Sequence, residues 1–163
     1  MRSLRRRRLR WGVLDHEIRA YDVAMDILEV NRIAIEEFRA NGGACSGWLE
    51  GAPVVLVTMT GAKSGRELIS PLVYSTDGDD VIVIASKGGA PNHPNWYHNL
   101  VANPTVTVEI GTDTWTADAE LAEGDERTRL YDAQAAMMPQ FKDYESSATE
   151  AGRVIPVFRL VRS

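Results

Sequence analysis

The sequence has little cysteine, few histidines and no long apolar run, and each shortage excludes a class of protein. Cys45 is the only cysteine, so an internal disulfide and a thiolate metal cluster are excluded, and a reducing, cytoplasmic location is expected. The histidines are His16, His93 and His98, and they show neither an H-x-x-x-H nor an H-E-x-x-H spacing, so no metal site is predicted. No apolar run approaches the ~18 residues that a membrane span requires.

Two nucleotide-binding signatures are also missing. No G-x-G-x-x-G segment follows a predicted strand and opens a helix, which argues against a Rossmann nicotinamide site. Residues 60–66, T-G-A-K-S-G-R, contain two glycines and a lysine but lack the G-x-x-x-x-G-K spacing of a P-loop. Hydrolysis of a nucleoside triphosphate is therefore not expected.

Basic residues are concentrated at the N-terminus. Six of the 18 lysines and arginines lie within residues 1–10, and the rest of the chain carries 12 basic against 23 acidic residues. An acidic body argues against general binding of nucleic acid, which depends on neutralising phosphates. We therefore divide the chain into a basic tail, residues 1–12, and a single domain, residues 13–163. Three roles remain open for the tail: a solvated segment, peripheral attachment to the inner face of the cell membrane with Trp11 as an interfacial anchor, or nucleic-acid contact.

An amphipathic helix is predicted to follow the tail. Asp15 is placed to cap its start, and Asn41-Gly42-Gly43 is placed to end it. This helix is expected to pack on the body of the protein, and contact with a membrane or with a partner subunit is the alternative. Apolar residues recur along it every three or four positions, as on one helix face, at Leu14, Ile18, Tyr21, Met25 and Leu28.

Six short aliphatic segments read as strands, and turns rather than helices join most of them. This predicts an α+β fold in which a largely antiparallel, barrel-like sheet is surrounded by helices. The second strand contains Pro71, which cannot donate to a ladder and so marks an edge or a bulge. The predicted strands are residues 54–59, 68–74, 81–85, 106–110, 114–121 and 154–161, and the predicted later helices are residues 94–103, 126–137 and, less regularly, 140–147.

Two glycine-bearing basic loops, residues 60–66 and 86–94, each follow a predicted strand. Both combine backbone N–H groups, hydroxyls and cations, which are the groups that hold phosphates or carboxylates in proteins. Lys63 supplies a point charge in the first loop, and Arg66 supplies a planar fork suited to two phosphate oxygens. An ordinary hairpin turn with solvated charges is the alternative for this loop.

The second loop leads into a helix whose N-terminus also favours an anion. Gly88 and Gly89 are expected to expose consecutive N–H groups, and Pro94 is expected at the first helical position. Trp96 and the tyrosine after it would either cover an apolar part of a ligand or pack in the core. His93 suits a structural position at the helix start better than the role of a general base.

Residues 50–104 resemble the deazaflavin-dependent nitroreductase and quinone reductase family, whose members bind coenzyme F420 on a split β-barrel. The matching segments are residues 50–53, 58–66, 86–100 and 102–104, at matching spacing, with further similarity at residues 38–43 and 155–157. The resemblance extends over roughly residues 31–160 and excludes the basic tail. One departure is Ala62, where many members carry arginine or lysine, so the affinity for the cofactor or the length of tail tolerated is expected to differ.

The resemblance implies an enzyme that passes a hydride from reduced coenzyme F420 to a quinone, a nitroaromatic or another unsaturated acceptor. Pro71 and Leu72 would lie against the deazaflavin ring. The lysine, arginine and serine residues of the two loops would hold the phosphate and the polyglutamate-bearing tail. Gly88, Gly89, Pro91 and Trp96 would shape the same channel. The implied cofactor-binding residues are Lys63, Ser64, Gly65, Arg66, Pro71, Leu72, Ser86, Lys87, Gly88, Gly89, Pro91, Asn92 and Trp96.

The resemblance implies that residues between the last helix and the final strand help form the acceptor pocket. Its candidate residues are Tyr131, Met138, Phe141 and Tyr144, of which Tyr144 is the candidate catalytic residue, as a proton or hydrogen-bond donor to the acceptor. An FMN-binding split-barrel oxidoreductase and a non-catalytic, membrane-associated carrier of a cofactor or lipid are the alternatives. Both a monomer and a homodimer are compatible with the sequence.

Overall fold

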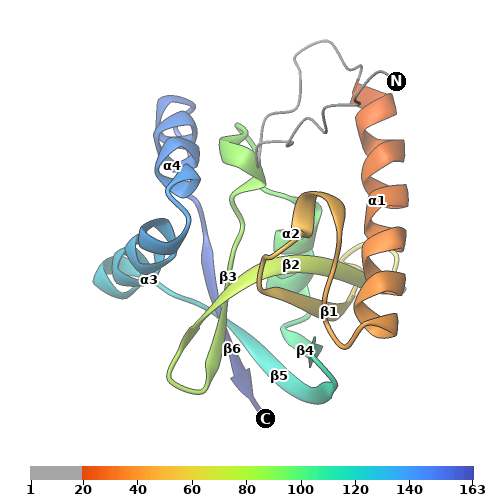
Figure 1. The fold of residues 1–163 in the computed structure, drawn as a ribbon. Helices are drawn as coiled ribbons and strands as arrows, with labels where there is room; N and C mark the ends of the chain where they lie inside the picture. The colour runs from red at the N-terminus through yellow and green to blue at the C-terminus, as the bar shows by residue number, and fades with distance from the viewer. Residues whose placement is uncertain (1–19) are drawn as a thin grey trace, which may run out of the picture.

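The computed structural model describes residues 20–163 (Figure 1). The basic tail, residues 1–12, and the predicted helix start at Asp15 lie outside the described residues. Among the described residues, no helix combines the length and the apolar character needed to cross a membrane.

Six strands form a closed barrel in the order β1-β2-β3-β6-β5-β4, and every neighbouring pair is antiparallel. The prediction of an α+β split barrel with six strands is therefore confirmed. The strands are β1 (Val54–Thr60), β2 (Glu67–Asp77), β3 (Asp80–Ile84), β4 (Thr105–Ile110), β5 (Asp113–Leu121) and β6 (Val157–Arg162).

The last strand is shorter than predicted, because residues 154–156 lie outside it. Pro156 has no N–H to donate, and its carbonyl accepts from the N–H of Ala85 at 2.9 Å. The carbonyl of Ile155 accepts from the guanidinium of Arg127 at 3.0 Å instead of from a strand. The prediction of a strand from Val154 is therefore wrong, since Pro156 cannot donate to a ladder and the carbonyl of Ile155 is bonded to a side chain.

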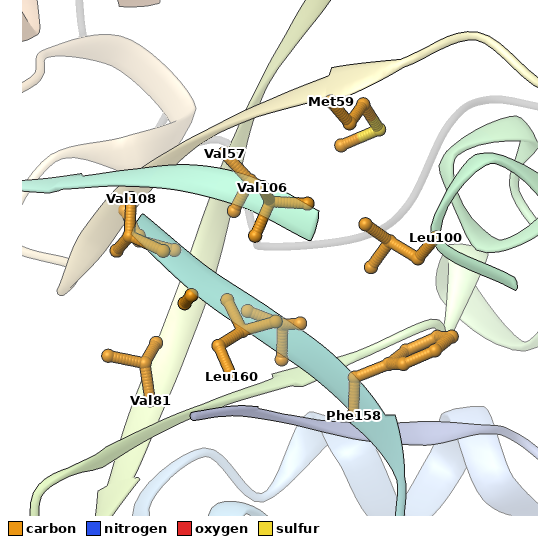
Figure 2. Packing of buried hydrophobic residues seen from close by; sticks show 11 residues of the cluster. Val57, Met59, Val81, Leu100, Val106, Val108, Phe158 and Leu160 are labelled. Carbon is orange, nitrogen blue, oxygen red and sulfur yellow. The ribbon is translucent and has the colours of Figure 1, made fainter. Parts of the chain in front are cut away.

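The barrel interior is filled by aliphatic side chains that alternate along each strand, as a period of two requires (Figure 2). Leu100 of helix α2 (Asn95–Ala102) adds to this cluster from one end of the barrel, where Phe158 of β6 also lies. The buried members are Val55, Val57, Met59, Val81, Val83, Leu100, Val106, Val108, Ala117, Phe158 and Leu160. Pro94 is the N-cap of α2 rather than its first helical residue, one position from the prediction.

Helix α1 (Ala20–Ala40) packs on the outside of the barrel through Ala34 and Phe38, which are 5% and 1% exposed. It ends where predicted, because Gly43 adopts a left-handed φ of 102° and donates its N–H to the carbonyl of Phe38 at 2.8 Å. N-terminal to Ala34, the apolar residues of this helix whose side chains the structure describes are exposed. Leu28, for example, is 68% exposed. A short 3₁₀ turn, η1 (Gly47–Leu49), then leads to β1.

Helices α3 (Gly124–Met137) and α4 (Gln140–Glu150) cover a second side of the barrel (Figure 1). Their buried residues pack on Ile82 and Ile84 of β3. Arg159 of β6 ties this layer to the β2–β3 turn, since its guanidinium contacts a carboxylate of α3 and two of the turn: Glu126, Asp77 and Asp80, at 2.7 to 2.8 Å.

Candidate functional site

The two basic loops emerge at the same rim of the barrel. Strand β2 is antiparallel to both β1 and β3, so β1 and β3 run in the same direction and end on the same side. The first loop follows the end of β1, and the second follows the end of β3. The topology therefore brings together the two segments that the sequence singled out.

The first loop is a tight hairpin with exposed cations. The N–H of Gly61 donates to the carbonyl of Arg66 at 2.8 Å, and the N–H of Gly65 donates to the carbonyl of Gly61 at 3.0 Å. Gly65 has a φ of 67°, a region that favours glycine. Lys63, Ser64 and Arg66 are exposed, so their charged and hydroxyl groups are available to a ligand at the rim.

Asn99 holds this loop to helix α2. Its side chain is only 9% exposed, and its Oδ1 accepts from the N–H of Ala62 at 2.9 Å. Asn103, one turn later, donates from Nδ2 to the carbonyl of Thr60 at 3.4 Å. Because α2 directly follows the second loop, these bonds fix the position of one loop relative to the other. The sequence placed Asn99 in a matching segment but indicated no role for it.

The second loop contains the 3₁₀ turn η2 (Lys87–Gly89), whose three residues all have left-handed φ angles. Lys87, with φ at 47°, is the only non-glycine residue of the described chain in this region, and such a conformation costs roughly 1–2 kcal/mol. Strain of this kind persists only where the surroundings impose it and concentrates at functional sites. The ammonium of Lys87 donates to Oδ1 of Asn92 at 3.1 Å, so the predicted ligand groups Lys87 and Asn92 lie together.

The prediction of consecutive exposed N–H groups at Gly88 and Gly89 is wrong for Gly89. The N–H of Gly89 donates to the carbonyl of Ser86 at 2.9 Å, and Gly89 is buried. In the described part of the chain, the N–H groups of Lys87 and Gly88 have no acceptor within the protein. The two consecutive free N–H groups of this turn are therefore one residue earlier than expected.

Gly89 is buried because helix α4 lies directly on it. A Cβ atom at this position would stand 2.6 Å from the carbonyl oxygen of Tyr144 and 2.9 Å from Cβ of Ser147. This close approach places the backbone of Tyr144 beside the loop, although the two residues are far apart in sequence. The candidate acceptor region and the candidate cofactor loop are thus in contact.

Arg153, in the segment between α4 and β6, reaches under the second loop. Its guanidinium donates from Nε to the carbonyl of Ala90 at 2.8 Å, from Nη1 to that of Ala85 at 3.0 Å and from Nη2 to that of Ser86 at 2.5 Å. Nη1 also lies 2.8 Å from Nδ1 of His93. A single side chain therefore bonds both ends of the loop, a role for which the sequence carried no local signal.

His93 accepts from Arg153, which determines its protonation. A guanidinium can only donate, so Nδ1 of His93 carries no proton and the ring is neutral. Burial and the charge of Arg153, with a smaller contribution from His98, lower the pKa of His93. The ring also lies 4.3 Å from that of Tyr97, centroid to centroid. These contacts favour the structural position over the general base for His93.

Strand β2 lies between the two loops. Pro71 lies in its first half, which pairs with β1 but not with β3. The N–H of Tyr74 bonds the carbonyl of Pro53, so alternation along the ladder puts Pro71 opposite Leu56 in a non-hydrogen-bonded pair. The nitrogen of Pro71 therefore points away from β1. On that side β3 pairs only with Tyr74–Asp77, which matches the predicted edge position of this proline.

Trp96 and Tyr97 are half-buried at the start of α2, above the barrel core. Their ring centroids lie 5.9 Å and 5.8 Å from that of Phe158 in β6. Part of each ring thus packs against the core, and the remaining surface is exposed near the second loop. The two alternatives from the sequence, packing and contact with a ligand, are compatible here.

The four acceptor-pocket candidates form one cluster on α3 and α4. Tyr131 is 1% exposed, and its hydroxyl donates to the carbonyl of Phe141 at 2.6 Å. The ring of Phe141 lies edge-on to that of Tyr144, with centroids 5.2 Å apart. Tyr131 and Phe141 are therefore packed inside, whereas Met138 and Tyr144 are half-buried at the surface of the cluster. Burial raises the pKa of Tyr144, so its hydroxyl stays protonated at neutral pH and can donate a hydrogen bond.

Comparison with known proteins identifies the family. Residues 30–161 match the model of the F420H2-dependent quinone reductase family. A Mycobacterium tuberculosis protein named as an F420H2-dependent quinone reductase is 34% identical over 128 residues, which are 77% of this chain and 85% of that protein.

Two solved structures show the same relationship. An F420H2-dependent reductase is 38% identical with a TM-score of 0.60, over 66% of this chain and 93% of that chain. A structure described as a domain-swapped dimer is 34% identical with a TM-score of 0.62, over 84% of this chain and 98% of that chain. The resemblance read from the sequence is thereby confirmed. The chain belongs to the F420H2-dependent quinone reductase family and is an oxidoreductase that uses reduced coenzyme F420.

Proposed function

We propose that this protein reduces quinones with reduced coenzyme F420, and that nitroaromatic and other unsaturated compounds can replace the quinone as acceptor. The observation that carries this proposal is the position of two cation-bearing loops at one barrel rim, on either side of the half-paired strand β2. The name of the Mycobacterium tuberculosis relative, a quinone reductase, supports the choice of acceptor.

The groups at the rim fit the anionic tail of this cofactor. Lys63, Arg66 and Lys87 are exposed cations, and the free N–H groups of the second loop add neutral donors. Lys87 has a left-handed backbone conformation, like Gly88. The loop therefore offers the backbone of Lys87 as well as its ammonium. The proposed tail-binding residues are Lys63, Ser64, Gly65, Arg66, Ser86, Lys87, Gly88, Gly89, Pro91, Asn92 and Trp96.

The ring of the cofactor is proposed to lie along β2, against Pro71 and Leu72. When bound, the deazaflavin supplies the hydride, and the protein supplies orientation and electrostatics. Tyr144 is the proposed donor to the acceptor oxygen, since its raised pKa keeps the hydroxyl protonated and its backbone touches the cofactor loop. Met138 at the surface of the cluster is proposed to contact the acceptor, with Phe141 and Tyr131 packed behind it.

A titration of tryptophan fluorescence with coenzyme F420 and with FMN tests the cofactor, and turnover of menadione and of a nitroaromatic tests the acceptor. We expect saturable binding of F420 and oxidation of reduced F420 that requires menadione. Tight binding of FMN without binding of F420 would favour the FMN-dependent alternative. Binding of F420 with no acceptor-dependent oxidation would favour the non-catalytic carrier.

Lys63→Ala is expected to weaken F420 binding by about 1.5–3 kcal/mol, roughly 10- to 150-fold in dissociation constant, because it removes one charged hydrogen bond to the anionic tail. The dissociation constant from the same fluorescence titration measures the effect. Lys142→Ala is the matched control, since Lys142 is an exposed lysine of α4 outside both loops. Equal affinities for the two variants would show that the first loop does not hold the tail.

A further inference from the structure

The carbonyl groups that Arg153 binds determine the direction in which the second loop presents its N–H groups. All peptide bonds of the described chain are trans, so the C=O of one residue points opposite to the N–H of the next. The carbonyls of Ala85 and Ser86 point at Arg153, and the N–H groups of Ser86 and Lys87 therefore point away from it. The N–H of Lys87 has no acceptor among residues 20–163.

Arg153 also closes the loop at both ends. Its guanidinium bonds the carbonyls of Ala85 and Ser86 where the loop begins, that of Ala90 where the 3₁₀ turn ends, and the ring of His93 just before α2. Because the three left-handed residues lie between these points, the contacts hold the strained part of the loop in one conformation.

Among residues 27–163, whose side chains the structure describes, the charge of Arg153 has no carboxylate partner. The ion pairs of these residues join other arginines to acids, and Arg153, which is 7% exposed, takes part in none of them. Backbone carbonyl dipoles and a neutral imidazole surround it instead. A buried cation without a counter-ion acts over a longer range than a paired one, so it contributes a favourable potential for an anion above the loop.

We infer that Arg153 is a positioning residue for cofactor binding: it holds residues 85–93 in the conformation that presents the loop N–H groups to the anionic tail. This inference rests on the proposed function of the loop. The purely structural alternative is that Arg153 only joins the α4–β6 segment to the barrel and stabilises the fold as any buried arginine would.

Arg127 provides a matched comparison. Its guanidinium also donates to a backbone carbonyl, that of Ile155, through Nε and Nη2 at 3.0 Å, and it contacts Glu145 at 2.9 Å. Arg127 links α3 and α4 to the segment before β6, in which Arg153 itself lies, but it does not touch the second loop. Loss of either guanidinium is expected to lower the melting temperature.

The test measures steady-state kinetics and F420 binding for the wild type, Arg153→Met and Arg127→Met. We expect Arg153→Met to raise the dissociation constant and the KM for reduced F420 by about tenfold or more, the size of a lost charged hydrogen bond, with the KM for menadione within about twofold of the wild type. Arg127→Met is expected to keep the wild-type affinity for F420. Arg153→Lys keeps the cation but cannot bond three carbonyls at once, so we expect it to weaken F420 binding as well.

The outcomes distinguish a failure of the proposed function from a failure of the inference about Arg153. No saturable F420 binding by the wild type would overturn the proposed function, and the inference with it. Wild-type binding together with an unchanged affinity in Arg153→Met would overturn the inference alone. Equal losses in Arg153→Met and Arg127→Met would do so too, because they would show a general effect of destabilisation. If Arg153→Met does not fold, an unchanged F420 affinity in Arg153→Lys decides against the inference.

Discussion

Replacing Gly89 with alanine is expected to destabilise the protein by about 2–5 kcal/mol and to weaken cofactor binding. Two costs combine in this estimate. The φ of 81° at Gly89 is left-handed, which costs an L side chain roughly 1–2 kcal/mol. The new methyl group would also lie 2.6 Å from the carbonyl oxygen of Tyr144 and 3.0 Å from its Cα, and overpacking against backbone costs about 1–3 kcal/mol.

The clash cannot be relieved by a side-chain rotation, because the nearest atoms are the carbonyl oxygen and Cα of Tyr144 and Cβ of Ser147, none of which moves when a side chain rotates. Either α4 or the loop must move, and the movement separates the Tyr144 region from the residues proposed to hold the cofactor. We therefore expect the KM for the quinone as well as that for reduced F420 to rise. Chemical denaturation measures the first effect, and steady-state kinetics at a temperature where the variant is folded measure the second.

Gly88→Ala separates the two costs. Gly88 has a similar φ of 62°, but a Cβ atom there would meet nothing within 4 Å. Its destabilisation is expected to stay near the left-handed cost of roughly 1–2 kcal/mol. If the two alanine variants are equally stable, the contact between α4 and the loop is not as close as the structure places it.

Phe158→Ala is expected to destabilise the protein by about 3–5 kcal/mol, the usual cost of emptying a fully buried aromatic site. Phe158 is 1% exposed and lies where β6 meets the start of α2 (Figure 2). Its ring supports those of Trp96 and Tyr97. A cavity at this point therefore loosens α2, which follows one loop and holds the other through Asn99. We expect weaker F420 binding in addition to the loss of stability.

Phe38→Ala is the control for the general effect. Phe38 is also 1% exposed, but it belongs to the separate cluster between α1 and the outer side of β1. Its loss is expected to cost a similar free energy of unfolding and to leave the dissociation constant of F420 unchanged at temperatures where both variants are folded. Phe158→Leu fills more of the cavity and extends the test if the alanine variant does not fold. Equal affinities for F420 in Phe38→Ala and the Phe158 variants would contradict the link between this core site and the loops.

The strands and the end of the first helix could be predicted from the sequence, because they depend on residues that are close together in the chain. Short aliphatic segments predicted six strands, and Asn41-Gly42-Gly43 predicted the end of the first helix, since only short-range geometry is involved. Pro71 indicated a strand position that needs no N–H, which the ladder between β1 and β2 provides. The predictions were wrong where another residue forms a hydrogen bond with a backbone group that was expected to be free or to join a strand. Arg127 binds the carbonyl of Ile155 ahead of the last strand, and Ser86 accepts the N–H expected to be free at Gly89.

The sequence by itself determined the strands, the composition of the two loops and, through the resemblance that their joint spacing carries, the family and its cofactor. Only the tertiary structure decided how the loops are held. Asn99 bonds the first loop across 37 residues, and Arg153 bonds the second across as many as 68. Such contacts depend on which segments a closed barrel brings together, and no local periodicity or turn propensity encodes them. The candidate ligand groups of the two loops can therefore be read from the sequence, whereas the buried polar residues that hold these loops are identified only in the closed barrel.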